Sequence, residues 1–196
     1  MALSPAVARD PYHSRQISCQ GYLRQDGLWD IEATITDTKG YPVSFYDGRN
    51  LPAGEALHEM QVRLTLNSQY EIVAAEASTE HSPYLICPEI AASYQQLVGI
   101  KIGPGFNRKI RELFKGRAGC THITELLGPM ATVAFQTISS GLRKRETAQP
   151  AVGERTGEQS RLLGRLIDSC HGWRSDGDPV RVQFPELYTG DAATDS

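Results

Sequence analysis

The 196-residue chain lacks the marks of several common protein classes. Its net charge is -3 at pH 7, so the basic footprint of a nucleic-acid-binding protein is missing. No apolar run approaches the roughly 18 residues that a membrane span requires. The first residues lack the basic start and apolar core of a secretory signal. The sequence therefore predicts a cytoplasmic protein that binds neither nucleic acid nor membrane.

Local metal and cofactor motifs are also missing. The chain has four cysteines, but none forms a CxxC pair, which excludes a zinc ribbon or a thioredoxin-type motif. The GxSxG, HExxH and GxGxxG patterns of common hydrolases, zincins and NAD enzymes are absent. We therefore expect no nucleotide cofactor, and any metal site must combine residues that lie far apart in the sequence.

Two hairpins are predicted in the first half of the chain. Residues 29 to 35 alternate between apolar and polar side chains, which is the period of a half-buried strand. Asp26-Gly27 is a strong turn signal before this strand. A second alternation, over residues 60 to 66, turns at residues 67–69 and resumes at Tyr70. This pattern predicts antiparallel pairing in both cases.

The second half of the chain is predicted to be helical. Pro88 suits the first turn of a helix that stops at Gly99, and a short helix follows over residues 107–115. A further helix begins near Thr121, and Gly128-Pro129 is expected to kink or split it. Strands followed by helices predict an α+β fold, with an antiparallel sheet in the N-terminal half and the helical half packed on one face.

The expected organisation is one domain with flexible ends. Residues 1–14 are interpreted as a flexible leader, and residues 15–182 as a single α+β domain that contains a polar loop over 139–160. Residues 183–196 form a tail that we expect to be partly disordered. An exposed hairpin edge allows a homodimer.

A candidate chemical site lies in the stretch GCTHITE. Cys120 precedes the predicted helix, and His122 and Glu125 are three positions apart, so they share one helix face. Thiolate, imidazole and carboxylate are ligand types of zinc and iron, and they also suit a nucleophile with a base or a proton-transfer pair. The plain alternative is a helix start capped by Thr121 with a buried thiol. Cys87 and His58 add to the case for a site, because one begins a predicted helix and the other opens a strand.

Other side chains are candidates for binding a substrate. Arg108 and Arg111 lie on a short, glycine-bracketed basic helix and suit an anion, although such a run is often only a solvated face. Trp29 and Tyr84 suit the wall of an apolar pocket, although aromatic residues on strands usually belong to the core.

Three segments of the chain resemble a known family: GYLRQDGLWDIEATITDTK, LVGIKIGPGFNRKIRELFKGRAGCTHITELLGPMATVAFQT and DSCHGWRSDG. On these segments the chain is similar to a bacterial family catalogued as a domain of unknown function. The resemblance implies a setting in the catabolism of aromatic or other unusual carbon sources.

A second resemblance concerns topology. The order of hairpin and helices is similar to that of the NifU-type iron–sulfur scaffolds, with a NifU- or SufE-like arrangement implied. Cys87 and Cys120 match two of the cluster cysteines, the first cysteine is missing, and the last motif is Cys-Thr-His. This departure suggests a mononuclear zinc or iron site whose ligands are His58, Cys87, Cys120 and His122.

Three functions are consistent with these observations. The first is a small-molecule catabolic enzyme with lyase-like or other proton-transfer chemistry on an aromatic-type substrate, in which His122, Glu125 and His58 move protons. Two versions of this site stay open, one that is metal-free and one that holds one zinc or iron ion. The second is a non-catalytic metal or iron–sulfur binding module. The third is a structural subunit in which these residues lie apart.

Overall fold

The computed structural model describes residues 3–147, 164 and 166–190. The chain divides into two compact units, Met1–Arg143 and Lys144–Ser196. Each unit is described by itself. The first holds the sheet, the helices that cover it and the candidate site.

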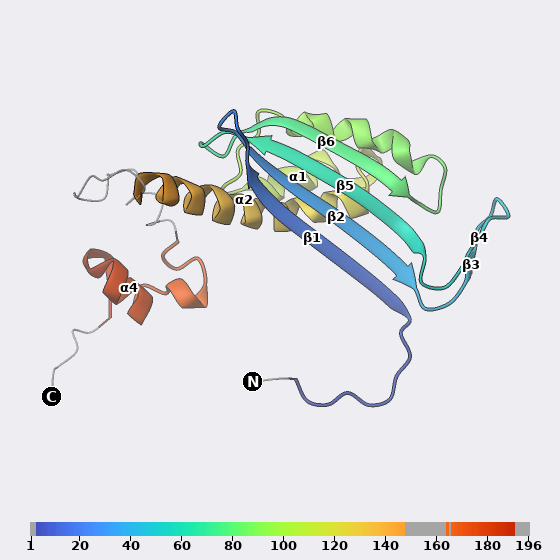
Figure 1. Ribbon diagram of the computed structural model, residues 1–196, viewed down its shortest axis with the longest axis horizontal. Helices are drawn as coiled ribbons and strands as arrows, with labels where there is room; N and C mark the ends of the chain where they lie inside the picture. Colours follow the sequence, from blue (N-terminus) through green and yellow to red (C-terminus); the bar gives the residue numbers. More distant parts are fainter. Residues whose placement is uncertain (1–2, 148–163, 165, 191–196) are drawn as a thin grey trace. The chain divides into compact units, whose positions relative to one another are not determined.

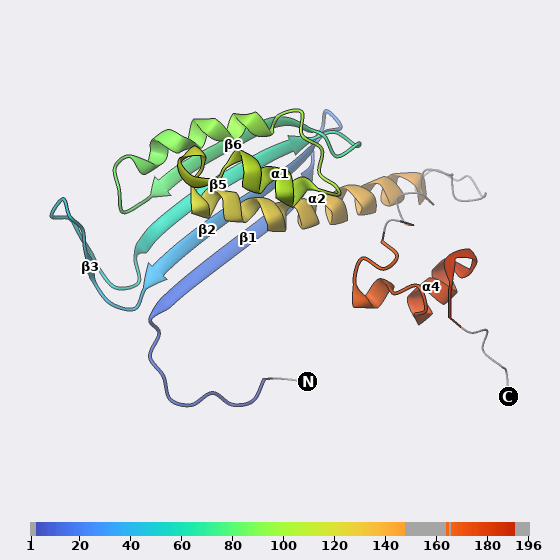
Figure 2. The ribbon, with the colours of Figure 1, turned by 180° about the vertical axis from the view of Figure 1, so that it is seen from behind.

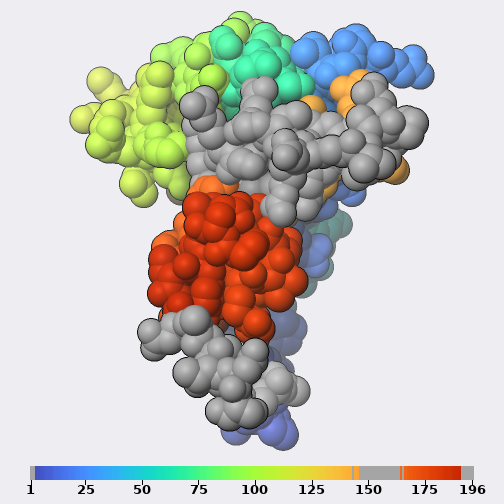
Figure 3. Space-filling view, turned by 90° about the vertical axis from the view of Figure 1, so that its left-hand side faces the viewer, coloured from blue at the N-terminus to red at the C-terminus, as the bar shows by residue number. Residues whose placement is uncertain are grey.

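Unit 1 is built on a four-stranded antiparallel sheet with the order β1-β2-β5-β6 (Figure 1). The strands are β1 (His13–Leu23), β2 (Trp29–Lys39), β5 (Ala56–Leu66) and β6 (Ile72–His81). The β1–β2 and β5–β6 turns lie side by side at one end of the sheet (Figure 3). Between β2 and β5, the short strands β3 (Val43–Ser44) and β4 (Asn50–Leu51) form a separate hairpin. The end of the sheet from which this hairpin projects is called the hairpin end.

All helices of unit 1 lie on one face of this sheet (Figure 2). They are the 3₁₀ helix η1 (Cys87–Leu97), α1 (Phe106–Leu113), the short η2 (Gly116–Ala118) and α2 (Thr121–Thr147). The core between sheet and helices contains Ile31, Ile35, Leu64, Leu126 and Met130, each no more than 1% exposed. The predicted α+β class is therefore confirmed, as is the position of the sheet in the N-terminal half.

The alternation of β2 explains which face is buried. Trp29, Ile31, Ala33 and Ile35 point toward the helices and are buried, whereas the residues between them are only partly buried. The opposite face of the sheet is polar: it carries Glu32, Thr34, Gln61, Arg63 and Ser78. A strand with one apolar and one polar face needs a cover on one side only.

Helix α2 runs along the sheet because two glycines allow it to approach closely. A Cβ atom at Gly141 would lie 2.2 Å from the Trp29 ring, and one at Gly21 would lie 2.0 Å from the Thr137 hydroxyl oxygen. These contacts hold the helix over the turn end of β1 and β2. About 28 Å of helix separates Gly141 from His122, close to the roughly 27 Å of strand between Trp29 and Asp37. Because these two lengths match, His122 lies at the hairpin end of the sheet.

Two details of α2 differ from the sequence-based expectation. The Gly128-Pro129 pair does not split the helix, which is continuous with Pro129 inside it. Proline removes only the hydrogen bond to the Glu125 carbonyl, and Glu125 is at the exposed surface. The polar loop expected over 139–160 does not begin at residue 139, because the helix continues to Thr147. Gly141 is required there by the contact with Trp29. Residues 148–160 lie outside the described part.

In the described part of unit 2, the chain forms short helices. These are η3 (His171–Trp173), α4 (Asp178–Gln183) and η4 (Pro185–Leu187). Pro179 occupies the first turn of α4, and the Asp178 carboxylate accepts a hydrogen bond from Arg181 at 2.9 Å, so this segment favours a helix. Within the described ranges, no helix has the length and apolar character needed to cross a membrane.

Candidate functional site

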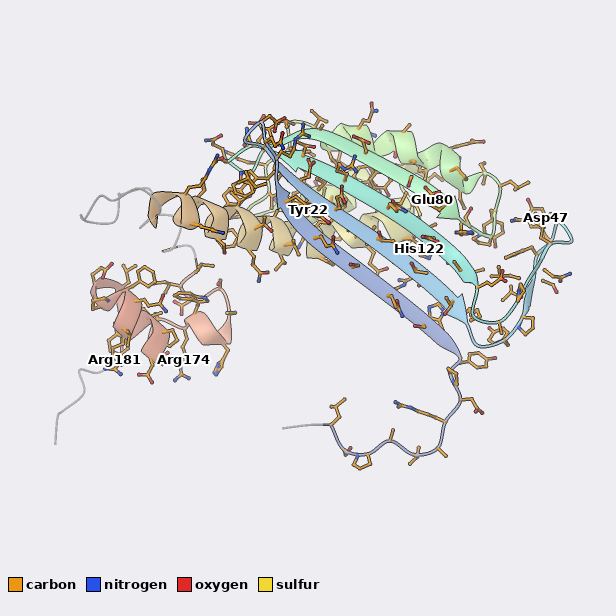
Figure 4. All side chains as sticks on the ribbon, viewed as in Figure 1. Tyr22, Asp47, Glu80, His122, Arg174 and Arg181 are labelled. Carbon is orange, nitrogen blue, oxygen red and sulfur yellow. The ribbon has the colours of Figure 1, made fainter. Side chains whose placement is uncertain are left out.

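Three side chains of the candidate site form one row across the helix-facing side of the sheet. The strand register pairs Arg15 with Asp37 and Asp37 with His58, at the hairpin end. Helix α2 adds His122 and Glu125 above this row. Figure 4 shows His122 toward the same end as Glu80 and the hairpin residue Asp47, with Tyr22 toward the opposite end.

Asp37 is the buried centre of the site. Its side chain is 1% exposed, and the Arg15 guanidinium donates to both carboxylate oxygens at 2.7 Å. Burial by itself raises the pKa of the Asp37 carboxyl, but the hydrogen bonds and charge of Arg15 outweigh it, so the pKa lies below its usual range. Asp37 is therefore a buried carboxylate that stays ionised because it is paired.

Two histidines converge on one oxygen of this carboxylate. His58 Nδ1 lies 3.1 Å and His122 Nε2 lies 3.4 Å from Asp37 Oδ2. The two imidazole rings stack with their centroids 3.8 Å apart. Burial lowers the pKa of both histidines, and repulsion between the two rings lowers that of His58 further. Both rings are therefore held in the neutral form that binds a metal or accepts a proton.

Glu125 and Cys120 border the cluster. The Arg15 guanidinium also donates to the Glu125 carboxylate, whose side chain is 43% exposed, so Arg15 links the buried acid to an acid at the surface. Cys120 Sγ lies 3.9 Å from His122 Nδ1. The Tyr94 hydroxyl accepts the Cys120 backbone N–H at 2.9 Å, which fixes the start of α2. His122 thus lies between a thiol and a carboxylate.

The cluster fits the geometry of a metal site. Ligand atoms of Asp37, His58 and His122 all lie within 4.8 Å of one another. A tetrahedral ion with bonds of about 2.0–2.1 Å separates its ligand atoms by about 3.3–3.4 Å. The two nitrogen–oxygen separations, 3.1 and 3.4 Å, are close to that spacing. Arg15 leaves a lone pair on each Asp37 oxygen free for an ion, and its two hydrogen bonds fix the orientation of the carboxylate.

The structure brings together some of the predicted site residues. His58 and His122 meet at Asp37, and Glu125 contacts Arg15 beside them. Cys120 lies beside His122. Cys87 begins η1, and within the described residues it does not belong to the ligand group of Asp37, His58 and His122.

The predicted substrate-binding residues lie elsewhere in unit 1. Trp29 is in the core at the turn end, where its indole N–H donates to the Ser68 hydroxyl at 3.4 Å. Tyr84 is 55% exposed. Arg108 and Arg111 lie exposed on α1. Their roles as substrate-binding residues stay predictions.

The central residue, Asp37, was missed from the sequence, although a signal for it exists. The alternation of buried residues 29, 31, 33 and 35 continues to position 37, which places a carboxylate on the buried face. A buried acid must be paired, and Arg15 occupies the matching position of β1. An ionisable residue on the apolar face of a strand was the available signal.

The lowered histidine pKa values predict a pH-dependent stability. Below the ordinary pKa of 6.5, the unfolded state binds protons that the half-buried His58 and His122 resist, so stability is complete above that value and falls as the pH decreases. We expect the urea midpoint of the protein to decrease between about pH 6.5 and 5. The decrease should be smaller in His122→Gln. A wild-type midpoint that is constant over this window would contradict the prediction.

Fold and site together define an α+β protein with an antiparallel sheet covered by helices on one face. This face carries an Asp–His–His cluster in which the aspartate is buried and paired with an arginine. The model of a family described as "Protein of unknown function (DUF2889)" matches residues 13–136, and the chain belongs to this family. The match includes Arg15, Asp37, His58 and His122, and it confirms the resemblance to a domain of unknown function. No curated protein and no solved structure gave a significant match. The similarity to NifU-type scaffolds stays a prediction.

Proposed function

We propose that the protein is a small-molecule enzyme in which Asp37, His58 and His122 hold one zinc or iron ion. The observation that carries the proposal is the convergence of two imidazoles and one buried carboxylate, with all ligand atoms within 4.8 Å. Two histidines with one carboxylate suit both catalytic zinc and non-haem iron. In this proposal Asp37 is a ligand of the ion together with His58 and His122, in place of the ligands Cys87 and Cys120 that the sequence had suggested.

The reaction class that we propose is lyase-like bond cleavage or a related proton transfer. A bound ion would polarise a substrate oxygen or lower the pKa of a bound water. The Arg15 guanidinium contacts both the Asp37 and the Glu125 carboxylates and so holds the two acids in place. Glu125, exposed beside the cluster, is the residue that would take up or release the proton. An aromatic-type substrate follows from the family setting that the sequence suggests.

Elemental analysis of the purified, untagged protein tests the metal site. We expect about one equivalent of zinc or iron per chain, and a loss of ion affinity of more than about 100-fold in His58→Ala, because one of three ligands is removed. His81→Ala is the matched control: His81 is on the neighbouring strand and its imidazole contacts Glu59 at 3.0 Å, outside the cluster. A wild-type protein that binds neither zinc nor ferrous ion after reconstitution contradicts the proposal.

A cofactor-free enzyme is the second candidate, favoured by the order of contacts around His122. Cys120 lies on one side of this imidazole and Asp37 on the other, which is the arrangement of a nucleophile, a base and an orienting acid. Turnover that persists after complete chelation would favour this version. A protein that binds the ion tightly but turns over no substrate would instead be a non-catalytic metal module.

A further inference from the structure

The four-stranded sheet has two outer strands, β1 and β6, and their edges are protected to different degrees (Figure 1). An outer strand presents unpaired backbone N–H and C=O groups, which proteins protect with charges, bulges, proline or a covering segment. At β6, the Ile72 N–H donates to the Ile100 carbonyl at 3.0 Å, and the Ile72 carbonyl accepts the Gly99 N–H at 2.8 Å. Glu76 and Glu80 add charges to this strand, and its pairing with β5 shifts register near each end. The β6 edge is therefore partly covered, charged and irregular.

The β1 edge has little of this protection. Its pairing with β2 runs through eleven consecutive residues without a register shift. The strand contains no proline, and no charged side chain follows Arg15 in it. Among the described residues, the outward backbone groups of β1 have no hydrogen-bond partner. In an antiparallel edge strand of this length, about five residues point both backbone groups outward. The β1 edge is therefore a regular template for a further strand.

The apolar layer on the helix-facing side is incomplete at β1. Ile17 pairs with Ile35 across the two strands, but Ile35 is fully buried whereas Ile17 is 38% exposed. Leu23, on the same face of β1, is 47% exposed. A neighbouring strand with its own helix layer on the same side of the sheet would cover both side chains.

We propose that β1 pairs antiparallel with β1 of a second copy of this chain, so that the two sheets join into a continuous sheet. Full overlap of the two strands places His13 opposite Leu23 of the partner subunit. In this register the odd-numbered residues of both strands lie on one face. Both helix layers then lie on the same side of the joined sheet, and the incomplete apolar layers of the two copies meet.

The side chains that this register brings together are compatible with one another. On the helix-facing side, Ile17 meets Cys19 of the partner subunit. On the polar face, Ser18 lies on the twofold axis opposite Ser18 of the partner subunit. Arg15 faces Gly21 of the partner subunit, so no like charges are directly opposed. This match of β1 with its own sequence favours a second copy as the occupant of the edge over an unrelated segment.

Sedimentation equilibrium of the full-length protein tests for the second copy. We expect a reversible dimer with a Kd at or below about 10 µM, as a specific interface between two folded chains gives. A protein that stays monomeric up to about 100 µM would overturn the inference.

A matched pair of lysine substitutions locates the interface. Ser18, Thr34, Gln61 and Ser78 form one row across the polar face, with Ser18 on β1 and Ser78 on β6 at its two ends. Ser18→Lys places like charges opposite each other at the twofold axis and is expected to raise the dimer Kd at least about tenfold. Ser78→Lys makes the same change at the other edge and should leave the Kd unchanged. The reverse order of effects, or no effect of either substitution, would overturn the inference.

Cross-linking keeps the inference testable if Ser18→Lys does not fold. Cβ atoms of directly opposed residues in an antiparallel pair lie about 4.5–5.5 Å apart, within reach of a short thiol-to-thiol cross-linker. We expect Ser18→Cys, in a Cys19→Ala background, to give a covalent dimer. Ser78→Cys in the same background is the control and should give no more than the background alone. Equal cross-linking of the two cysteine variants would overturn the inference.

The dimer and the metal site can be tested separately. His58 lies on β5, away from the β1 edge, so His58→Ala is expected to lose the ion while the dimer Kd stays that of the wild type. A dimer that binds no ion would overturn the metal proposal alone. A monomer that binds the ion would overturn the pairing through β1 alone.

Discussion

Replacing Asp37 with alanine is expected to lower the free energy of unfolding by about 3 kcal/mol and to abolish the ion binding that we propose for the cluster. The Asp37 side chain is 1% exposed, and its removal takes away both charged hydrogen bonds of Arg15 and the acceptor shared by His58 and His122. Breaking a buried ion pair costs about 3–5 kcal/mol. We expect the lower end because Arg15 is 31% exposed and retains its contact with Glu125.

Urea unfolding of Asp37→Ala and Glu32→Ala provides the comparison. Glu32 is on the same strand, on the opposite face, where its carboxylate accepts a hydrogen bond from Arg63 at 2.7 Å. Those side chains are 40% and 47% exposed, so Glu32→Ala should cost less than about 1 kcal/mol. Equal losses in the two variants would show that the Asp37 cluster contributes no more than a surface pair.

Replacing Gly141 with alanine is expected to destabilise unit 1, although helix propensity alone predicts a gain of about 1 kcal/mol. The added Cβ would lie 2.2 Å from the buried Trp29 ring, a distance that forces the ring or the helix to move. Overpacking of a core costs about 1–3 kcal/mol. Packing outweighs propensity, and we expect a net loss of about 1–2 kcal/mol in urea unfolding.

The matched control for Gly141→Ala lies in the same helix. A Cβ at Gly128 would meet no atom within 4 Å, so Gly128→Ala should keep or raise stability. The gain stays below about 1 kcal/mol because Pro129 restricts the residue before it. Opposite signs for the two substitutions would establish the close approach of α2 to the sheet. Stabilisation by both would mean that α2 packs farther from Trp29.

The sheet was predictable from the sequence because its cause is local. A two-residue period of apolar side chains, together with the Asp26-Gly27 turn, determines the β1–β2 hairpin from neighbouring residues alone. The same reasoning found the β5–β6 pair. The shared helix face of His122 and Glu125 was also predictable, because it is separate from the apolar face of the helix. That this face belongs to a chemical site stays a prediction.

The composition of the site was not predictable in the same way. Asp37 meets Arg15 and His58 only after β1, β2 and β5 adopt their register. Cys87 and Cys120 were predicted as metal ligands because they lie at the starts of predicted helices. This is a local feature, and it carries no information on which side chains converge in the folded protein. The continuity of α2 through Gly128-Pro129 depends on solvent reaching the freed carbonyl. The contact of Gly141 with Trp29 depends on packing between distant segments.

The long sequence separation of the site residues links ligand binding to the survival of the folded protein. Arg15 and Glu125 are 110 positions apart, and His58 belongs to a third segment, so the unfolded chain holds no such site. Anything that occupies the assembled cluster therefore adds its binding free energy to folding, about 2.7 kcal/mol at a free concentration of 100 times Kd. If the proposed ion occupies the cluster, protease susceptibility will depend on the supply of that ion, and a cell short of it will degrade this protein faster than a replete one.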